Sequence, residues 1–171
     1  MTGAHQHLPA AADPASGEVR AREAEQFVTF HFGRHLFGLP IDEVIEINRA
    51  LEITPVPLGP PYVAGVVNLR GQILTAIHLA RRVGLADAEE ERGTYNNVII
   101  GDRDEPVSLL VEEIGDVMSI PALLIEPPPP LISGMNVRFV KQVCKLQDRL
   151  LIILDGEALQ QGEAERGAER E

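Results

Sequence analysis

The order of apolar and polar residues predicts short β-strands along most of this chain. Between Phe27 and Phe32 the side chains alternate, so that Val28, Phe30 and Phe32 share one face of an extended segment. A polar turn follows, and Leu36–Leu39 returns as a second strand. The first part of the chain is therefore predicted to fold as an antiparallel hairpin.

Proline marks the ends of the next predicted elements. Pro40 has no backbone donor, so the second strand is expected to end there, followed by a helical turn over Ile41–Val44. Val44–Ile47 then extends again, and four prolines between residues 55 and 61 form a stiff connection. Further along, Leu79–Leu85 predicts a short helix that ends near a glycine.

The central hairpin is the most distinctive predicted element. Two β-rich runs, Tyr62–Val67 and Gln72–Ile77, flank the polar step Asn68–Gly71. Gly71 can adopt a positive φ, and Asn68 tolerates the unusual backbone angles of a turn. The pattern therefore predicts a tight turn between the two strands.

A single arginine lies at the tip of this hairpin. Between residues 53 and 86 there is no acidic residue, and the charged residues are Arg70, Arg81 and Arg82. Arginine is well suited to a bidentate contact with a carboxylate, which this chain or a partner would supply. The sequence leaves open that Arg70 is an ordinary solvated side chain.

The second half of the chain repeats the order of elements of the first half. It reads as strand, turn, strand, connector, strand, Pro-rich loop and long hairpin, with Arg149 at the second hairpin tip. The corresponding segments are Asn97–Ile100, Val107–Val111, Glu112–Ile120, Val137–Leu146 and Leu150–Leu154. Such a repeat indicates an all-β fold, with a few short helices, built from two similar small β-barrels.

Composition separates a folded domain from two polar tails. We expect a disordered N-terminal arm over residues 1–25, a domain over 26–159, an acidic linker over 86–93 and a disordered acidic tail over 160–171. The formal charge is −11, and no basic stripe is present. Nucleic-acid binding and attraction to anionic membranes are therefore not expected.

The sequence offers no set of residues for catalysis or cofactor binding. Cys144 is the single cysteine and is expected to be a buried, inert thiol, and the five histidines lack the spacing of a metal site. No phosphate-binding glycine loop and no nucleophile elbow are present. With no apolar run long enough to cross a membrane and no secretion signal, we expect a cytoplasmic, non-enzymatic binding module without cofactors or metals.

Several of these segments together resemble the CheW-like family of chemotaxis coupling proteins, over about Gln26 to Leu159. The segments that carry the resemblance are Phe27–Phe30, Phe37–Leu39, Val44–Ile47, Val63–Gly71 and Gly115–Val117. The resemblance implies two SH3-like, five-stranded β-barrels that share a core. It also implies an adaptor that joins the cytoplasmic tips of methyl-accepting chemoreceptors to the regulatory domain of a CheA-type histidine kinase, in arrays at the inner membrane but without insertion into it.

The resemblance also implies a binding site. The receptor-facing groove between the barrels would include Val44, Glu46, Ile47, Val98, Ile114 and Val117. Arg70 would pair with Glu46 and position the groove edge, while Gly65, Asn68 and Gly71 shape the hairpin. For each apolar residue, simple core packing is an equally good interpretation.

Departures from the family pattern leave other functions open. The run Thr75–Ala80 lacks the usual proline and aspartate and has His78 in the place of the acid, and Ser108 and Glu112 replace a usual glycine and aspartate. The alternative hypothesis is a diverged CheW-like module that regulates another kinase, or a pilus or motility pathway, without direct receptor binding. A third is an enzyme of unknown type with its site in the central cleft.

Overall fold

The structure is a computed structural model that describes residues 23–85, 94–132 and 134–161. The predicted linker over 86–93, most of the predicted arm and nearly all of the predicted tail lie outside these residues. The strands are β1 (Ala24–Phe32), β2 (His35–Pro40), β3 (Val44–Arg49), β4 (Ile53–Thr54), β5 (Val63–Leu69), β6 (Gln72–His78), β7 (Asn96–Asp102), β8 (Glu105–Val111), β9 (Glu113–Pro121), β10 (Ile125–Glu126), β11 (Val140–Lys145) and β12 (Leu150–Leu154).

Short helical elements connect these strands. They are α3 (Leu79–Arg82) and the 3-10 turns η2 (Ile41–Glu43), η4 (Ala122–Leu124) and η5 (Val137–Phe139). A further helical segment covers residues 156–161. The predicted turn after Pro40 and the predicted helix after the central hairpin are both present.

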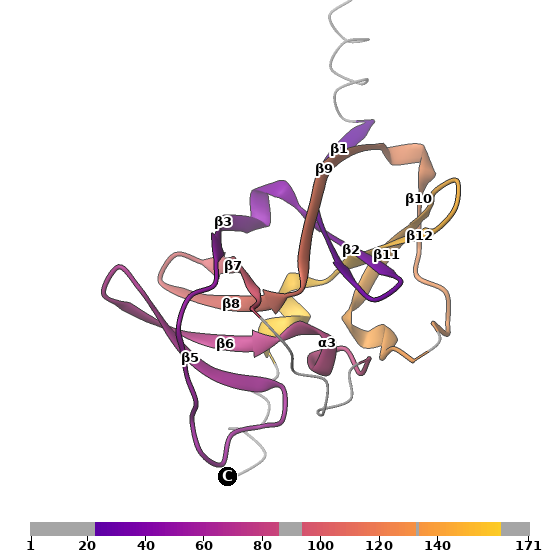
Figure 1. The fold of residues 1–171 in the computed structure, drawn as a ribbon. Helices are drawn as coiled ribbons and strands as arrows, with labels where there is room; N and C mark the ends of the chain where they lie inside the picture. Colours follow the sequence, from indigo (N-terminus) through magenta and orange to yellow (C-terminus); the bar gives the residue numbers. More distant parts are fainter. Residues whose placement is uncertain (1–22, 86–93, 133, 162–171) are drawn as a thin grey trace, which may run out of the picture.

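The described strands form two six-stranded sheets that lie side by side (Figure 1). The middle sheet has the order β4-β5-β6-β8-β7-β3, and the terminal sheet has the order β10-β11-β12-β2-β1-β9. The two orders correspond strand by strand, and each includes one parallel pair, β6 with β8 and β12 with β2. The predicted mostly β fold with two similar units is thus confirmed, although each sheet has six strands and the two edge strands are not paired to close it.

Each unit takes strands from both halves of the sequence. The hairpin β1–β2 belongs to the terminal sheet, but the next strand, β3, pairs with β7 of the middle sheet. In the same way β7 and β8 belong to the middle sheet, while β9 pairs with β1. The two exchanged strands, β3 and β9, therefore connect the units.

One apolar core joins the two sheets. Phe30, Phe37 and Leu154 of the terminal sheet pack in the same buried cluster as Val98 and Leu109 of the middle sheet. Smaller buried clusters fill each unit separately. The shared core is the feature that makes the two sheets one folding unit.

Two boundaries differ from the sequence prediction. The first strand begins at Ala24, which pairs with Pro121 and lies three residues before Phe27, the start of the predicted alternation. The expected long strand from Val137 begins as a 3-10 turn, because the Asn136 side chain accepts a hydrogen bond from the Arg138 amide at 3.0 Å. Such a side-chain cap competes with strand pairing, so β11 begins only at Val140.

Cys144 is buried, as predicted, in the smaller cluster of the terminal sheet. Burial in this apolar environment, together with nearby Glu126, raises the thiol pKa above its ordinary value. A raised pKa lowers the thiolate fraction near neutrality, which is consistent with an inert side chain.

Arg82 connects the middle unit to the terminal unit. Its guanidinium lies 4.2 Å from the ring centre of Tyr62 and 4.5 Å from that of Phe139. It also donates to the carbonyls of Ala158 and Leu159, at 3.3 and 3.2 Å. One side chain of the middle unit thus holds η5 and the C-terminal helix against α3.

We expect Arg82→Ala to lower the free energy of unfolding by about 2–3 kcal/mol, because it removes cation–π contacts and two hydrogen bonds. Urea denaturation measures the change. Arg34→Ala, at an exposed turn, is the matched control and should change stability by less than about 0.5 kcal/mol. Equal effects of the two variants would contradict the bridging role of Arg82.

Candidate functional site

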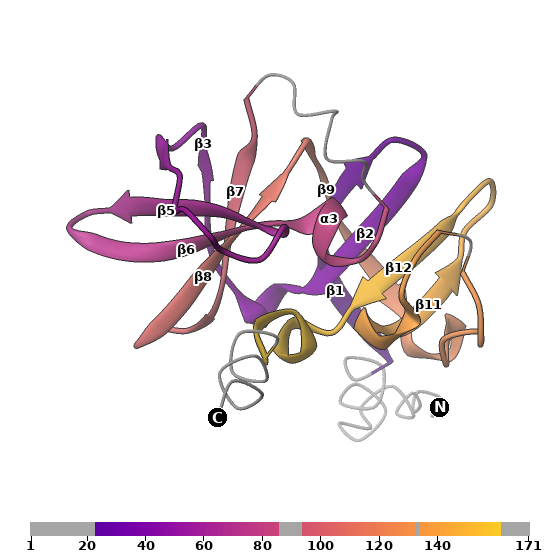
Figure 2. The same cartoon turned by 90° about the horizontal axis from the view of Figure 1, so that it is seen from below.

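The turn of the central hairpin has both of its middle residues at positive φ. Arg70 has φ 52° and Gly71 has φ 90°, as in a type I′ turn. The Asn68 side chain accepts a hydrogen bond from the Gly71 amide at 2.8 Å. The hairpin projects away from the other elements (Figure 2), so this turn places a cationic side chain beside the edge strand β3.

Arg70 and Glu46 form a bidentate ion pair. The two terminal nitrogens of the guanidinium lie 2.8 and 2.7 Å from the two oxygens of the Glu46 carboxylate. The Asn48 side chain donates to the same carboxylate at 2.8 Å. The hydrogen bonds from Arg70 and then Asn48 hold the pKa of Glu46 below its ordinary value, and the same pair raises the pKa of Arg70.

The ion pair lies on one face of β3, and the opposite face of the strand borders a groove. Because side chains alternate along a strand, Glu46 and Asn48 point to one side, and Ile47 and Arg49 to the other. Ile47 and Arg49 line a cavity of about 510 Å³ together with Ile114 of β9. The cavity therefore lies between the two exchanged strands, at the edge of the shared core.

A bulge in β9 brings two predicted groove residues to one face. Val28 of β1 pairs with Val117 and Phe30 pairs with Ile114, so β9 has one more residue than β1 between these pairs. The extra residue places Ile114 and Val117 on the same side of the strand. Val117 is 53% exposed, which leaves it free to contact a partner.

The other predicted groove residues differ in how much of their surface is exposed. Ile47 is 40% exposed, whereas Val44 and Ile114 are half-buried against the shared core. The prediction of Val98 as a groove residue is wrong. It is fully buried, because β7 lies between β3 and β8 and is covered by the shared core.

Of the six cavity residues that the sequence prediction missed, four have side chains longer than those of Ala50 and Thr94. They are Arg49, Tyr95, Asn96 and Glu113. Alternation along β3 already places Arg49 on the face of Ile47, so this residue had a usable signal. The others lie at the ends of β7 and β9, and nothing local in the sequence indicates that these ends meet.

Two departures from the family pattern have structural partners. His78 is buried, and its Nε2 lies 3.0 Å from the Tyr95 hydroxyl. Ser108 is fully buried and donates to the Asn97 side chain at 2.8 Å. Both side chains thus belong to the interior of the middle unit, and Tyr95 connects His78 to the lining of the cavity.

Comparison with known proteins identifies the family. The family described as CheW-like domain matches residues 26–163. The chain belongs to the CheW-like domain family. It is 32% identical over 136 residues to chemotaxis protein CheW of Treponema pallidum, covering 78% of this chain and 80% of that protein. It is 29% identical to chemotaxis protein CheW of Bacillus subtilis, and the match covers 86% of this chain and 94% of that protein.

A solved structure supports the same assignment. The crystal structure of the scaffolding protein TtCheW from Thermoanaerobacter tengcongensis has a TM-score of 0.69 and 30% identity, covering 77% of this chain and 88% of that one. The resemblance inferred from the sequence is therefore confirmed. Because this is a family of scaffold proteins, the prediction that the CheW-like chain is not an enzyme is confirmed as well.

The described helices bear on whether the chain crosses a membrane. Within the described ranges, the helices are all too short or too polar to cross a bilayer.

Gly65 supports the hairpin from its base. A Cβ built at this position, where φ is +150°, would lie 2.2 Å from the Thr54 carbonyl oxygen. We expect Gly65→Ala to lower the free energy of unfolding by about 2–4 kcal/mol through this backbone clash. Thermal or urea unfolding measures it.

Gly71→Ala is the matched control for Gly65→Ala, because it has positive φ but no atom within 4 Å. It should cost about 1–2 kcal/mol from backbone strain alone. A Gly65 variant no less stable than the Gly71 variant would show that the close approach to Thr54 does not matter.

The ion pair predicts a specific pH dependence. Since the folded state lowers the pKa of Glu46, the pair stabilises the protein above the unfolded pKa of about 4.3, and this stabilisation is lost as pH falls through the lower folded value. A small stability difference between the wild type and Glu46→Gln should thus be present at pH 7 and disappear in acid. Glu52→Gln, an exposed carboxylate, should show no such difference, and a pH-independent Glu46 effect would refute the assignment.

Proposed function

We propose that this chain is a chemotaxis adaptor that couples chemoreceptors to a CheA-type histidine kinase. Membership of the CheW-like domain family supports the proposal, and relatives over most of its length are named chemotaxis protein CheW. The observation that carries the proposed binding mode is the cavity between β3 and β9, whose strand β3 is held by the Arg70–Glu46 pair.

The groove fits the end of a helical bundle. Ile47 and Ile114 line it, and the exposed Val117 extends the apolar surface on the side of β9 that carries Ile114. Arg49 and Glu113 supply charges of opposite sign around it. An amphipathic helix docks through apolar anchors, and surrounding charges set its register. We infer that a receptor tip places its apolar face over Ile47 and Val117.

The ion pair acts by positioning. Arg70 is 71% exposed at its side chain, so the pair contributes little to global stability. It nevertheless holds β3 in place on the face opposite to Ile47. We infer that the loss of this pair lets the groove edge move and weakens docking without unfolding the chain.

The second proposed partner is the regulatory domain of the kinase. The proposed location of the adaptor is the receptor array on the cytoplasmic side of the inner membrane. The groove lies between β3 and β9, so the opposite edge strands of the two sheets, β4 and β10, lie outside it. Simultaneous binding of two proteins on different faces is the property that an adaptor needs. Transient signalling contacts of this kind bury modest areas, so moderate affinity is expected.

Reconstitution with receptor fragments and the kinase of the same cell tests the proposal. Arg70→Glu is expected to abolish receptor-dependent stimulation of kinase autophosphorylation, because two carboxylates then repel each other beside β3. The exchanged pair, Glu46→Arg with Arg70→Glu, should recover much of the stimulation. Near-UV circular dichroism checks that each variant remains folded.

Apolar variants test the groove independently. Ile47→Asp and Val117→Asp should each weaken receptor binding at least tenfold, because a charge replaces an apolar anchor. Leu58→Asp is the matched control, since Leu58 is 98% exposed on another loop. Full stimulation by Arg70→Glu, together with unchanged binding of both groove variants, would show that receptors do not use this surface.

A further inference from the structure

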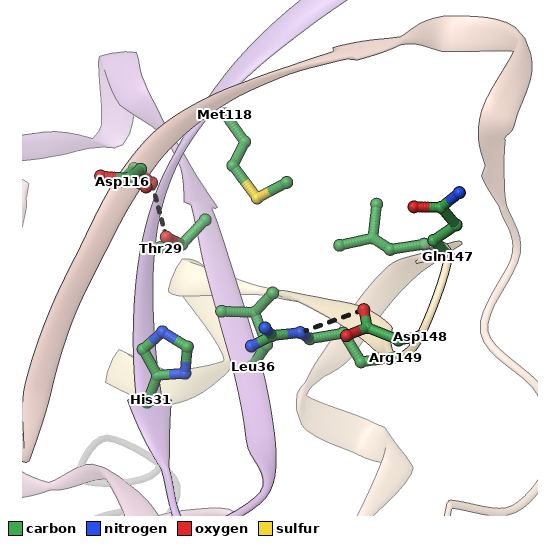
Figure 3. Close-up of a pocket in the computed structure, with 9 residues that line it drawn as sticks. Thr29, His31, Leu36, Asp116, Met118, Gln147, Asp148 and Arg149 are labelled. Carbon is green, nitrogen blue, oxygen red and sulfur yellow. Dashed lines mark hydrogen bonds and ion pairs between the residues drawn. The ribbon is translucent and has the colours of Figure 1, made fainter.

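A second pocket opens in the terminal unit, on the side of its hairpin tip (Figure 3). Its volume is about 400 Å³, in the range of small ligand sites. Leu36, Met118 and Leu146 form its apolar part, and these residues continue the small core of the terminal unit. Asp116 of β9 and Arg149 of the β11–β12 turn also line it.

One charged residue of this pocket, Asp116, corresponds to a member of the ion pair of the other unit. Because the two sheets have the same strand order, β9 corresponds to β3 and the β11–β12 hairpin corresponds to β5–β6. In sequence, Glu113-Ile114-Gly115-Asp116-Val117 aligns with Glu43-Val44-Ile45-Glu46-Ile47, so Asp116 occupies the place of Glu46. Ile153 pairs with Gly38 as Ala76 pairs with Ser108, and this register places Gln147, not Arg149, where Arg70 stands.

The two units differ in whether this pair is formed. Arg70 binds Glu46 through both terminal nitrogens. Arg149 instead contacts its neighbour Asp148 through Nε, at a distance of 3.6 Å. Within the described part of the chain, no contact joins Arg149 to Asp116, and Figure 3 shows the terminal nitrogens of Arg149 directed away from Asp148.

A missing arginine in the turn and a shorter acid explain the difference. In the β5–β6 hairpin, Arg70 and Gly71 lie between the paired residues Leu69 and Gln72. In the β11–β12 hairpin, the Leu146 amide donates to the Arg149 carbonyl at 2.8 Å, so the two turn residues are Gln147 and Asp148, and neither is a cation. Aspartate is also one methylene shorter than glutamate. The pocket thus remains open, with a cation on one wall and a carboxylate on the other.

We propose that this pocket binds an extended partner segment that carries an acidic, an apolar and a basic side chain at alternate positions. The acidic group pairs with the terminal nitrogens of Arg149, in the manner of the Glu46 carboxylate with Arg70. The apolar side chain covers Leu36 and Met118. The basic group balances Asp116 and Asp148, which otherwise leave the pocket with a net negative charge.

The geometry favours a peptide strand as the occupant. Alternate side chains of an extended chain point to the same side, so three of them reach one open pocket together. The pocket lies on the terminal unit, apart from the cavity between β3 and β9, and the two share no lining residue. The proposal therefore goes beyond receptor coupling and does not depend on it.

Nuclear magnetic resonance with a defined probe tests the proposal on the full chain. The probe is the blocked peptide acetyl-Glu-Ser-Leu-Ser-Lys-amide, and the signals are the methyl groups of Leu36, Met118 and Leu146. Saturable shifts of these methyls are expected. Replacing the peptide Glu by Gln should weaken binding about fivefold, the effect of one partly exposed charge-assisted contact.

A double-mutant cycle assigns that effect to one side chain. In Arg149→Gln, binding should be about fivefold weaker, and the peptide Glu-to-Gln change should have no further effect. Asp116→Asn should behave in the same way toward replacement of the peptide Lys by Gln. Arg103→Gln, an exposed arginine on the β7–β8 turn of the other unit, should bind like the wild type.

Three outcomes would overturn the proposal. One is the absence of methyl shifts at millimolar peptide. Another is an Arg149→Gln variant that keeps its fold, as its amide spectrum shows, and binds both peptides as the wild type does. The third is tighter binding of free leucine than of the peptide, which would make a small zwitterion the occupant.

Discussion

The structure depends on the exchange of β3 and β9 between the two sheets. Each hairpin that precedes these strands lies in one unit, and the strand that follows completes the other unit. Neither sheet can therefore form fully while the other is absent. The shared apolar core, with Phe30 and Phe37 packed in one cluster with Val98 and Leu109, fills the space that this exchange encloses. Removing water from that interface is the main favourable term that holds the units together.

The same exchange creates the cavity that we propose as the binding site. Exchanged strands lie at the edge of their sheets, so β3 and β9 are each paired on one side only. The cavity between them borders the shared core, and the apolar character of Ile47 and Ile114 follows from that position. Edge strands invite unwanted pairing unless they are protected. The Arg70–Glu46 pair gives β3 a fixed place beside the projecting hairpin and leaves its opposite face available.

Local pattern was enough to predict most elements, and it failed where distant segments meet. Alternation located the strands, and Asn68 with Gly71 located the hairpin turn. Parallel pairing of β12 with β2 and of β6 with β8 joins residues far apart in sequence, and no local signal specifies it. Val98 was placed in the groove by the family resemblance alone, and its full burial agrees with core packing, the other interpretation that the sequence left open. The Arg70–Glu46 pair was inferred from the family resemblance, whereas composition alone left the partner of Arg70 open.

The two hairpin tips differ although the two sheets share one strand order. In the middle unit Arg70 pairs with Glu46. In the terminal unit Gln147 stands in the place of that arginine, and Asp116 and Arg149 form no pair among the described residues. An exposed ion pair adds little stability, so its presence or absence has small consequences for folding. Its consequences for surface shape are larger. Where the pair forms, it holds the strand that borders the groove, and where it does not form, the two charges are left to face a pocket of about 400 Å³.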